Sequence, residues 1–216
     1  MDGKLFREEP SSNYLLVEGP DDAQIFVHLL RHYHLTSYIA IEAKNGIEKL
    51  LDDIDVELDR SGLKRLGIVV DADTDIDARW QSLRNRFIQT GYSSIPLVPL
   101  AEGTIISQQG RPKVGIWLMP TNTLSGMLED FISFLIPSND VLWPLATNIV
   151  QQVVQTECRF PIVQVQKANV HTWLAWQQEP GKPMGQAITK KYLDANAPHA
   201  QQIVKWLRQL FELEGK

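Results

Sequence analysis

Short apolar runs alternate with longer amphipathic segments along the first 90 residues. The runs are rich in β-branched residues and predict strands over Tyr14–Glu18, Tyr38–Ala43 and Leu66–Val70. Apolar residues at three- and four-residue intervals predict helices from Pro20 through Tyr33, over Gly46–Ser61 and over Asp77–Thr90. This β-α-β-α-β-α order predicts parallel strands joined by crossover helices.

The pattern changes beyond residue 90. Two apolar runs, Ile95–Leu100 and Lys113–Met119, flank a Gln-Gln-Gly-Arg-Pro turn, which predicts further strands with a hairpin. From Ser125 onward helical spacing predominates and predicts helices over Gly126–Ile136, Val141–Thr156, Ala168–Gln177, Gln186–Leu193 and Pro198–Leu213. We therefore expect one α/β domain over residues 1–216, with a polar arm over 1–12, an α/β core over 14–124 and a helical C-terminal portion over 125–216.

Charge is distributed unevenly. The chain has a net charge of −5, but residues 1–80 hold 9 Lys/Arg against 17 Asp/Glu, and the remainder is mildly basic. We read the five acidic residues between 52 and 59 as the solvated face of a helix. The single cysteine, Cys158, excludes an internal disulfide, and no run has signal-peptide or membrane-spanning character, so we expect a cytoplasmic protein without a membrane partner.

Carboxylates follow two of the predicted strands. Glu18 and Asp22 come after the first strand, and Asp71 and Asp73 come after the third. In an open α/β sheet the ligand crevice lies outside the carboxyl ends of the strands, so these side chains are expected to converge there. Crowded carboxylates repel one another unless a cation lies between them or their pKa values rise. A divalent metal ion is the simplest explanation of the pattern.

These residues resemble the pattern of the Toprim domain, which topoisomerases, bacterial primases and OLD-family nucleases share. Its motifs are a Glu-Gly after the first strand and an Asp-x-Asp after a later one, here Glu18-Gly19 and Asp71-Ala72-Asp73. The chain is more similar to small stand-alone, OLD-like Toprim proteins, because Asp22 follows Glu18 by four positions and the segment around Glu129 also looks like that group. The resemblance implies a Toprim-like, Rossmannoid three-layer domain with a central, mainly parallel sheet.

The resemblance also implies roles. Glu18 would act as metal ligand or general acid/base, Asp71 and Asp73 would hold Mg²⁺ or Mn²⁺, and Asp22 with Glu129 would seat a second ion. Lys167 would neutralise charge in the transition state. Three alternatives stay open: Asp22 as a residue favoured by the helix dipole, Asp130 in place of Glu129, and Lys182 in place of Lys167.

The function so implied is a Mg²⁺- or Mn²⁺-dependent phosphodiesterase or nuclease acting on DNA. OLD-like Toprim units often work with an ATPase in phage defence or DNA repair, so we expect a separate ATPase subunit as a partner, and we consider a homodimer. The alternative is a non-catalytic Toprim-like subunit that acts by docking. A haloacid-dehalogenase phosphatase is disfavoured because Asp75 stands where that family has threonine. A nucleotide-binding ATPase is disfavoured because no phosphate-binding Gly-x-x-x-x-Gly-Lys-Ser/Thr loop occurs. His28 and His32 have i, i+4 spacing, but no further Cys or His supports a zinc site.

Overall fold

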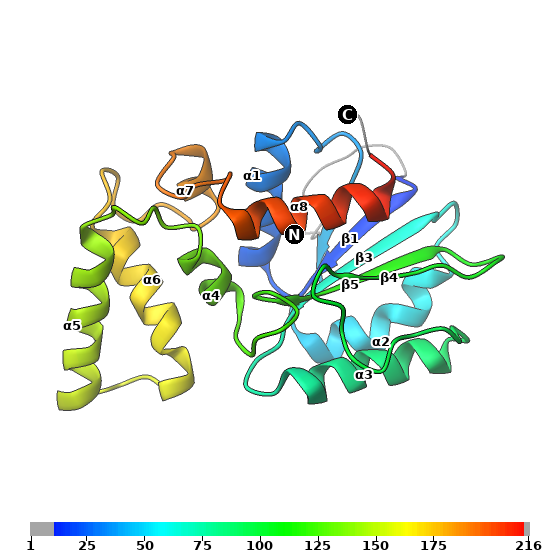
Figure 1. Cartoon of the computed structure of the whole chain (residues 1–216), viewed down its shortest axis with the longest axis horizontal. Helices are drawn as coiled ribbons and strands as arrows, with labels where there is room; N and C mark the ends of the chain where they lie inside the picture. The colour runs from blue at the N-terminus through cyan, green and yellow to red at the C-terminus, as the bar shows by residue number, and fades with distance from the viewer. Residues whose placement is uncertain (1–10, 214–216) are drawn as a thin grey trace.

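The structure is a computed structural model, and it describes residues 11–213. Most of the predicted polar arm (residues 1–10) and the last three residues of the predicted domain lie outside that range. A five-stranded sheet forms the centre, in the order β2-β1-β3-β5-β4 (Figure 1). Its strands are β1 (Asn13–Val17), β2 (Ala40–Ala43), β3 (Arg65–Asp71), β4 (Thr104–Ile106) and β5 (Lys113–Met119). Only β4 in this sheet is antiparallel, so the predicted mainly parallel sheet is confirmed.

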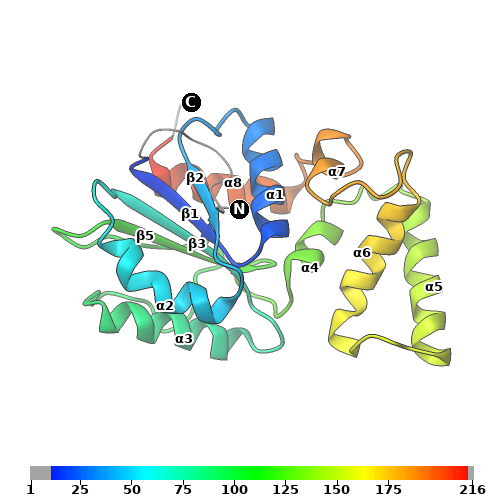
Figure 2. The same ribbon diagram turned by 180° about the vertical axis from the view of Figure 1, so that it is seen from behind.

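Helices cover both faces of the sheet. The helices α2 (Ile47–Leu58) and α3 (Ile76–Gln89) lie on one face, and α1 (Pro20–His32) and α8 (Pro198–Phe211) lie on the other (Figure 2). The remaining helical elements are α4 (Leu128–Ser133), α5 (Leu142–Thr156), the 3-10 turn η1 (Ile162–Gln164), α6 (Val165–Ala175) and α7 (Gln186–Thr189). This is a Rossmann-like, three-layer α/β architecture with a helical C-terminal portion, as expected.

Side chains that alternate along the strands build two apolar cores. In β1, Leu15 and Val17 join the core beneath α1 and α8, whereas Tyr14 and Leu16 join the core beneath α2 and α3. Successive residues of a strand point to opposite faces, so a sheet covered on both sides needs an almost continuous apolar run. The strands that carry the candidate site are therefore anchored from both faces.

Two glycines let α8 pack closely on the sheet. A Cβ on Gly67 would lie 3.1 Å from Leu210 Cδ2, and one on Gly115 would lie 2.5 Å from the same atom and 2.9 Å from Trp206. Both glycines occupy neighbouring strands in register. Their lack of a side chain is what allows Leu210 and Trp206 to reach the strand backbone.

The predicted strand over Ile95–Leu100 is wrong. That segment has no regular structure, and β4 forms instead at Thr104–Ile106, antiparallel to β5. Pro96 and Pro99 remove two backbone donors from the segment, so it cannot complete a strand ladder. The segment contacts α3 instead: Pro96 O accepts hydrogen bonds from Trp80 Nε1 and Arg84 Nε of that helix.

Three other expectations need correction. The helices predicted over Gly126–Ile136 and Gln186–Leu193 shrink to the short α4 and α7. The acidic face of α2 is not wholly solvated: Glu57 is buried, and its carboxylate pairs with Lys44 Nζ at 2.6 Å. Lys44 also pairs with Asp53, so two of the five acidic residues belong to an ion-pair network behind β2. Within residues 11–213 no helix is long and apolar enough to cross a membrane.

Candidate functional site

Four carboxylates lie together at the carboxyl end of the sheet. The strands β1 and β3 are parallel neighbours, with Val17 opposite Val69, so Glu18 and Asp71 emerge side by side. Asp22 stands in the first turn of α1 and Glu129 in the first turn of α4. Glu18, Asp22 and Glu129 all raise the pKa of Asp71 through their charges. Of the four residues expected to converge beyond the strand ends, Glu18, Asp22 and Asp71 therefore lie in this cluster, and Glu129 joins them.

The pKa of Asp71 is affected by all three of the other carboxylates in this cluster. Its Oδ1 accepts a hydrogen bond from Leu128 N at 2.9 Å, which connects the end of β3 to the start of α4. Burial is the main cause that raises the pKa of Asp71 to about 9, and repulsion from Asp22, Glu18 and Glu129 adds to it. At neutral pH, without a cation, this carboxyl group therefore keeps its proton.

Glu18 and Asp22 each present an oxygen that has no partner. Asp22 Oδ2 accepts a hydrogen bond from Gly19 N at 3.1 Å, but its Oδ1 is buried without a hydrogen-bond partner, as is Glu18 Oε2. Burial, followed by the charge of Glu18, raises the pKa of Asp22 to about 7. Burial also raises the pKa of Glu18, against an opposing hydrogen bond from the Asp71 backbone and the charge of Arg79. Buried acceptors without donors are unusual in folded proteins, and their presence indicates that something else satisfies them.

Lys167 is the lysine that reaches the cluster. Its Nζ lies 3.4 Å from Oε1 of the buried Glu129, and it is supplied by α6, which packs against α4. Lys182 instead pairs with Glu179 at 3.2 Å in an exposed loop. The side chain of Lys167 is half-exposed, so it borders the cluster on the solvent side. The choice that the sequence left open thus falls to Lys167.

Asp73 stands at the rim of the site. Its carboxylate forms an ion pair with Arg79, from the first turns of α3, and it shares a cavity of about 320 Å³ with Thr74, Asp75 and Arg79. Its charge still reaches Glu18 and Asp71, because it contributes to the raised pKa of both. The structure therefore places Asp73 beside the cluster, held by a cation of the protein. Sequence reasoning missed Arg79, since an arginine six residues past an Asp-x-Asp carries no recognisable spacing signal.

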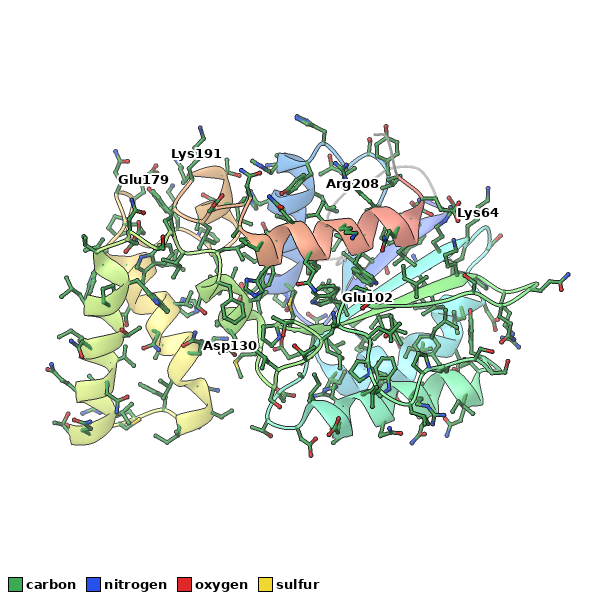
Figure 3. The ribbon with its side chains drawn as sticks, in the orientation of Figure 1. Lys64, Glu102, Asp130, Glu179, Lys191 and Arg208 are labelled. Carbon is green, nitrogen blue, oxygen red and sulfur yellow. The ribbon has the colours of Figure 1, made fainter. Side chains whose placement is uncertain are left out.

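Gly126 connects Asp73 to α4. The two residues exchange backbone hydrogen bonds, Asp73 N to Gly126 O at 2.8 Å and Gly126 N to Asp73 O at 2.7 Å. Gly126 has φ 143°, and a Cβ there would lie 2.7 Å from Asp130 Oδ2. Asp130 is occupied locally, because its Oδ2 accepts a hydrogen bond from Met127 N at 2.8 Å (Figure 3 labels its position). Glu129, rather than its neighbour Asp130, therefore faces the cluster.

The donor set suits a hard divalent cation. All four side chains offer oxygen, the ligand type that Mg²⁺ and Mn²⁺ prefer, and two of the buried oxygens have no hydrogen-bond donor. Burial, and after it mutual repulsion, holds the pKa values of Asp22 and Asp71 high, as expected where a cation is the missing counter-charge. Over residues 11–213, however, no group of three or more His, Cys, Asp or Glu side chains already has the arrangement of a metal site. Cation binding would have to draw the carboxylates closer.

A separate cavity of about 610 Å³ lies at the other end of α1. It is lined in part by His28, His32, Lys191 and Asn196, and by none of the four carboxylates. The imidazoles there are hydrogen-bonded, His28 Nδ1 with Thr189 Oγ1 at 2.7 Å and His32 Nε2 with Asn196 Oδ1 at 3.4 Å. Both histidines thus belong to a polar helix face, in keeping with their interpretation from sequence.

The fold and the site define an α/β protein with a buried carboxylate cluster at the carboxyl edge of a parallel sheet. Residues 12–212 match a family model described as protein of unknown function (DUF3226), and the chain belongs to that family. Comparisons with curated proteins and with solved structures found no match.

Proposed function

We propose that the protein is a Mg²⁺- or Mn²⁺-dependent phosphodiesterase of the Toprim type, acting on DNA. The carboxylate cluster carries this proposal: Glu18, Asp22, Asp71 and Glu129 come from four separate elements and face one another in a largely buried space. Buried carboxylates that serve only structure are usually paired with cations, whereas Lys167, half-exposed beside Glu129, is the ion-pair partner described for these four. The Glu-Gly and Asp-x-Asp motifs, placed after β1 and β3, support the Toprim assignment.

Each residue of the site would have its own role in phosphodiester cleavage. The four carboxylates would hold the cation, which when bound supplies positive charge to the displacement at phosphorus. Glu18, which has a buried oxygen without a hydrogen-bond partner, would accept a proton from an attacking water. Lys167, next to Glu129, would neutralise a phosphate oxygen at the mouth of the site. Asp73 would join them only after a bound cation replaces Arg79 as its partner.

The setting of this activity follows from the same resemblance. A reducing cytoplasm suits a chain whose single cysteine, Cys158, is left as a free thiol. A separate ATPase subunit would regulate the nuclease in phage defence or DNA repair. A non-catalytic docking subunit is the second candidate, and the ion pair between Asp73 and Arg79 favours it, because that pair removes one expected metal ligand.

Nicking of supercoiled plasmid separates the two candidates. Wild type, Asp71→Asn and Asp75→Asn are incubated with Mn²⁺, alone and with any co-encoded ATPase. Asp75 Oδ1 accepts a hydrogen bond from Ala78 N and so caps α3. Because Asp75 lies outside the cluster, Asp75→Asn is the control for removing an acidic group near the site. Cleavage by wild type and Asp75→Asn, lost in Asp71→Asn and in EDTA, supports the enzyme. Equal activity in all three proteins, or none with the ATPase present, rejects it.

A pair of lysine variants tests the mouth of the site. Lys167→Gln is expected to lower the cleavage rate by at least about tenfold, because a lost electrostatic contact in the transition state is worth one to several powers of ten. Lys182→Gln is the matched control, since that lysine pairs with Glu179 outside the cluster. Single-turnover rates at saturating DNA measure both. Equal rates for the two variants would remove Lys167 from the site.

A further inference from the structure

One face of α5 exposes a row of aliphatic side chains. Val141, Leu145, Ile149 and Val153 follow one another at four-residue intervals and are exposed by 73%, 53%, 45% and 40%. Residues at this spacing lie on one side of a helix. In the whole of α5 only Ala146 and Val150 are buried, and each directly follows a residue of the row, so they lie about 100° around the helix from it. This aliphatic row is the kind of contiguous apolar surface that marks an interaction site.

The row lies on a helical hairpin that projects from the body of the protein. The helices α5 and α6 pack against each other, and α6 in turn packs against α4. In Figures 1 and 2 α5 is the outermost helix, and α6 lies between it and the rest of the fold. The exposed face of α5 is therefore presented outward, where another protein surface can reach it along its full length of about 22 Å.

The chemistry of the row identifies its partner. Residues 141–156 contain no Asp, Glu, Lys, Arg or His, although 22% of the chain is charged and three or four charges would be expected. In a two-fold dimer each residue near the axis meets its own copy, so a charge there would face a like charge. Apart from Thr156, the exposed polar residues of this segment are amides, Asn148, Gln151, Gln152 and Gln155, and an amide both donates and accepts, so it can pair with its own copy. A second copy of the same surface therefore meets no like charge and can pair with these amides.

We propose that the protein forms a two-fold dimer in which α5 of one copy packs on α5 of the other. The aliphatic rows interdigitate, and the amides border them. The i, i+4 ridges of the two helices fit each other's grooves, as in the commonest class of helix packing. Each hairpin then contributes two helices to a four-helix assembly. Because α6 lies between α5 and α4, the carboxylate cluster of each copy stays outside the interface.

Sedimentation equilibrium tests the dimer. The area offered by one hairpin is modest, so we expect dissociation in the micromolar range and use about 1 to 200 µM protein. Ile149→Asp is expected to raise the dissociation constant at least about 100-fold, because it would place two like charges near the axis. Val56→Asp is the matched control: Val56 is 71% exposed on α2, away from the row. A dimer in wild type and Val56→Asp, with a monomeric Ile149→Asp, supports the proposal.

Wild type that stays monomeric throughout this range, or Ile149→Asp that still dimerises, would overturn it. A cross-linking experiment tests the geometry without relying on a charged variant. Cys158 is the only cysteine and is replaced by serine, after which Ile149→Cys or Val56→Cys carries the single thiol. A disulfide requires Cα atoms within about 7 Å, so on copper-catalysed air oxidation Ile149→Cys should link into a covalent dimer and Val56→Cys should not. The reverse pattern, or no linkage in either, contradicts a contact between two α5 helices.

Discussion

Replacing Asp71 by asparagine should stabilise the protein when no divalent cation is present. Asparagine has nearly the same shape and retains an Oδ1 that can accept the hydrogen bond from Leu128 N. It removes the carboxyl group that is most strongly raised in pKa by burial and by its acidic neighbours. The variant thus separates the cost of holding this acid in the fold from the contribution of its hydrogen bond.

The pKa of Asp71 sets the magnitude. The unfolded chain ionises this group with an ordinary pKa of 3.8, whereas the folded protein, with a pKa of about 9, keeps it protonated at pH 7. Asp71 must therefore take up a proton when the chain folds at pH 7. Because pH 7 lies roughly 3 pH units above the pKa of the unfolded chain, this protonation costs about 4 kcal/mol. Asparagine avoids this cost, but its NH₂ group needs an acceptor in the buried site. We expect a net gain of about 1–4 kcal/mol in the free energy of unfolding.

Urea unfolding measures the free energy of unfolding of each protein without a divalent cation, in EDTA, and with one, in Mn²⁺. In EDTA, Asp71→Asn should be more stable than wild type, and Asp75→Asn should differ from wild type by less than about 0.5 kcal/mol. In Mn²⁺ at a hundredfold excess over the dissociation constant, wild type should gain about 2.7 kcal/mol and Asp71→Asn should gain little. A variant that is less stable than wild type in EDTA would contradict the prediction, because the cost of protonating Asp71 would then be smaller than the cost of burying the asparagine NH₂ group.

Three further predictions follow from the same structure. In EDTA the free energy of unfolding should fall as pH rises from about 4 to 9, since the raised pKa values of Asp22 and Asp71 stabilise the fold at low pH and that contribution is lost as each group ionises; a flat urea-unfolding profile would contradict it. Gly126→Ala should lower the free energy of unfolding by about 1–3 kcal/mol more than Gly110→Ala does, as measured by urea unfolding. Both glycines have positive φ, but only at Gly126 would the added Cβ clash with a side chain. Equal losses in the two variants would exclude the clash. Glu57→Ala should cost about 2–4 kcal/mol, because it leaves a buried lysine with one partner fewer, and a neutral result would show that this ion pair contributes nothing.

Much of the fold could be predicted because local patterns and tertiary packing agree. The apolar runs that form β1 and β3 are bounded by carboxylates and followed by helical periodicity, so both their type and their order are readable. The run at Ile95–Leu100 is apolar enough to predict a strand, but it forms none. Its two prolines lack the backbone N–H groups that a strand ladder needs. The burial of Glu57 was not predicted because its partner, Lys44, comes from the residue that follows β2 and not from the same helix.

The site was partly predictable for a comparable reason. Parallel topology brings the ends of neighbouring strands together, so the meeting of Glu18 and Asp71 follows from strand order alone. The contacts of Asp73 depend instead on the backbone turn after β3, where Asp73 takes φ 54° and pairs with Gly126. No sequence period encodes that turn. The ion pair between Asp73 and Arg79 could therefore be found only in three dimensions.

Anomalous scattering from a crystal of the protein soaked in Mn²⁺ would test the shared-cation claim most directly. A peak within about 2.0–2.4 Å of oxygens from Glu18, Asp71 and at least one of Asp22 and Glu129 is the result we predict. A second peak beside Asp73, with Arg79 displaced, would extend the site to its rim. No peak in the cluster, or a peak only on the acidic surface of α2, would contradict the account.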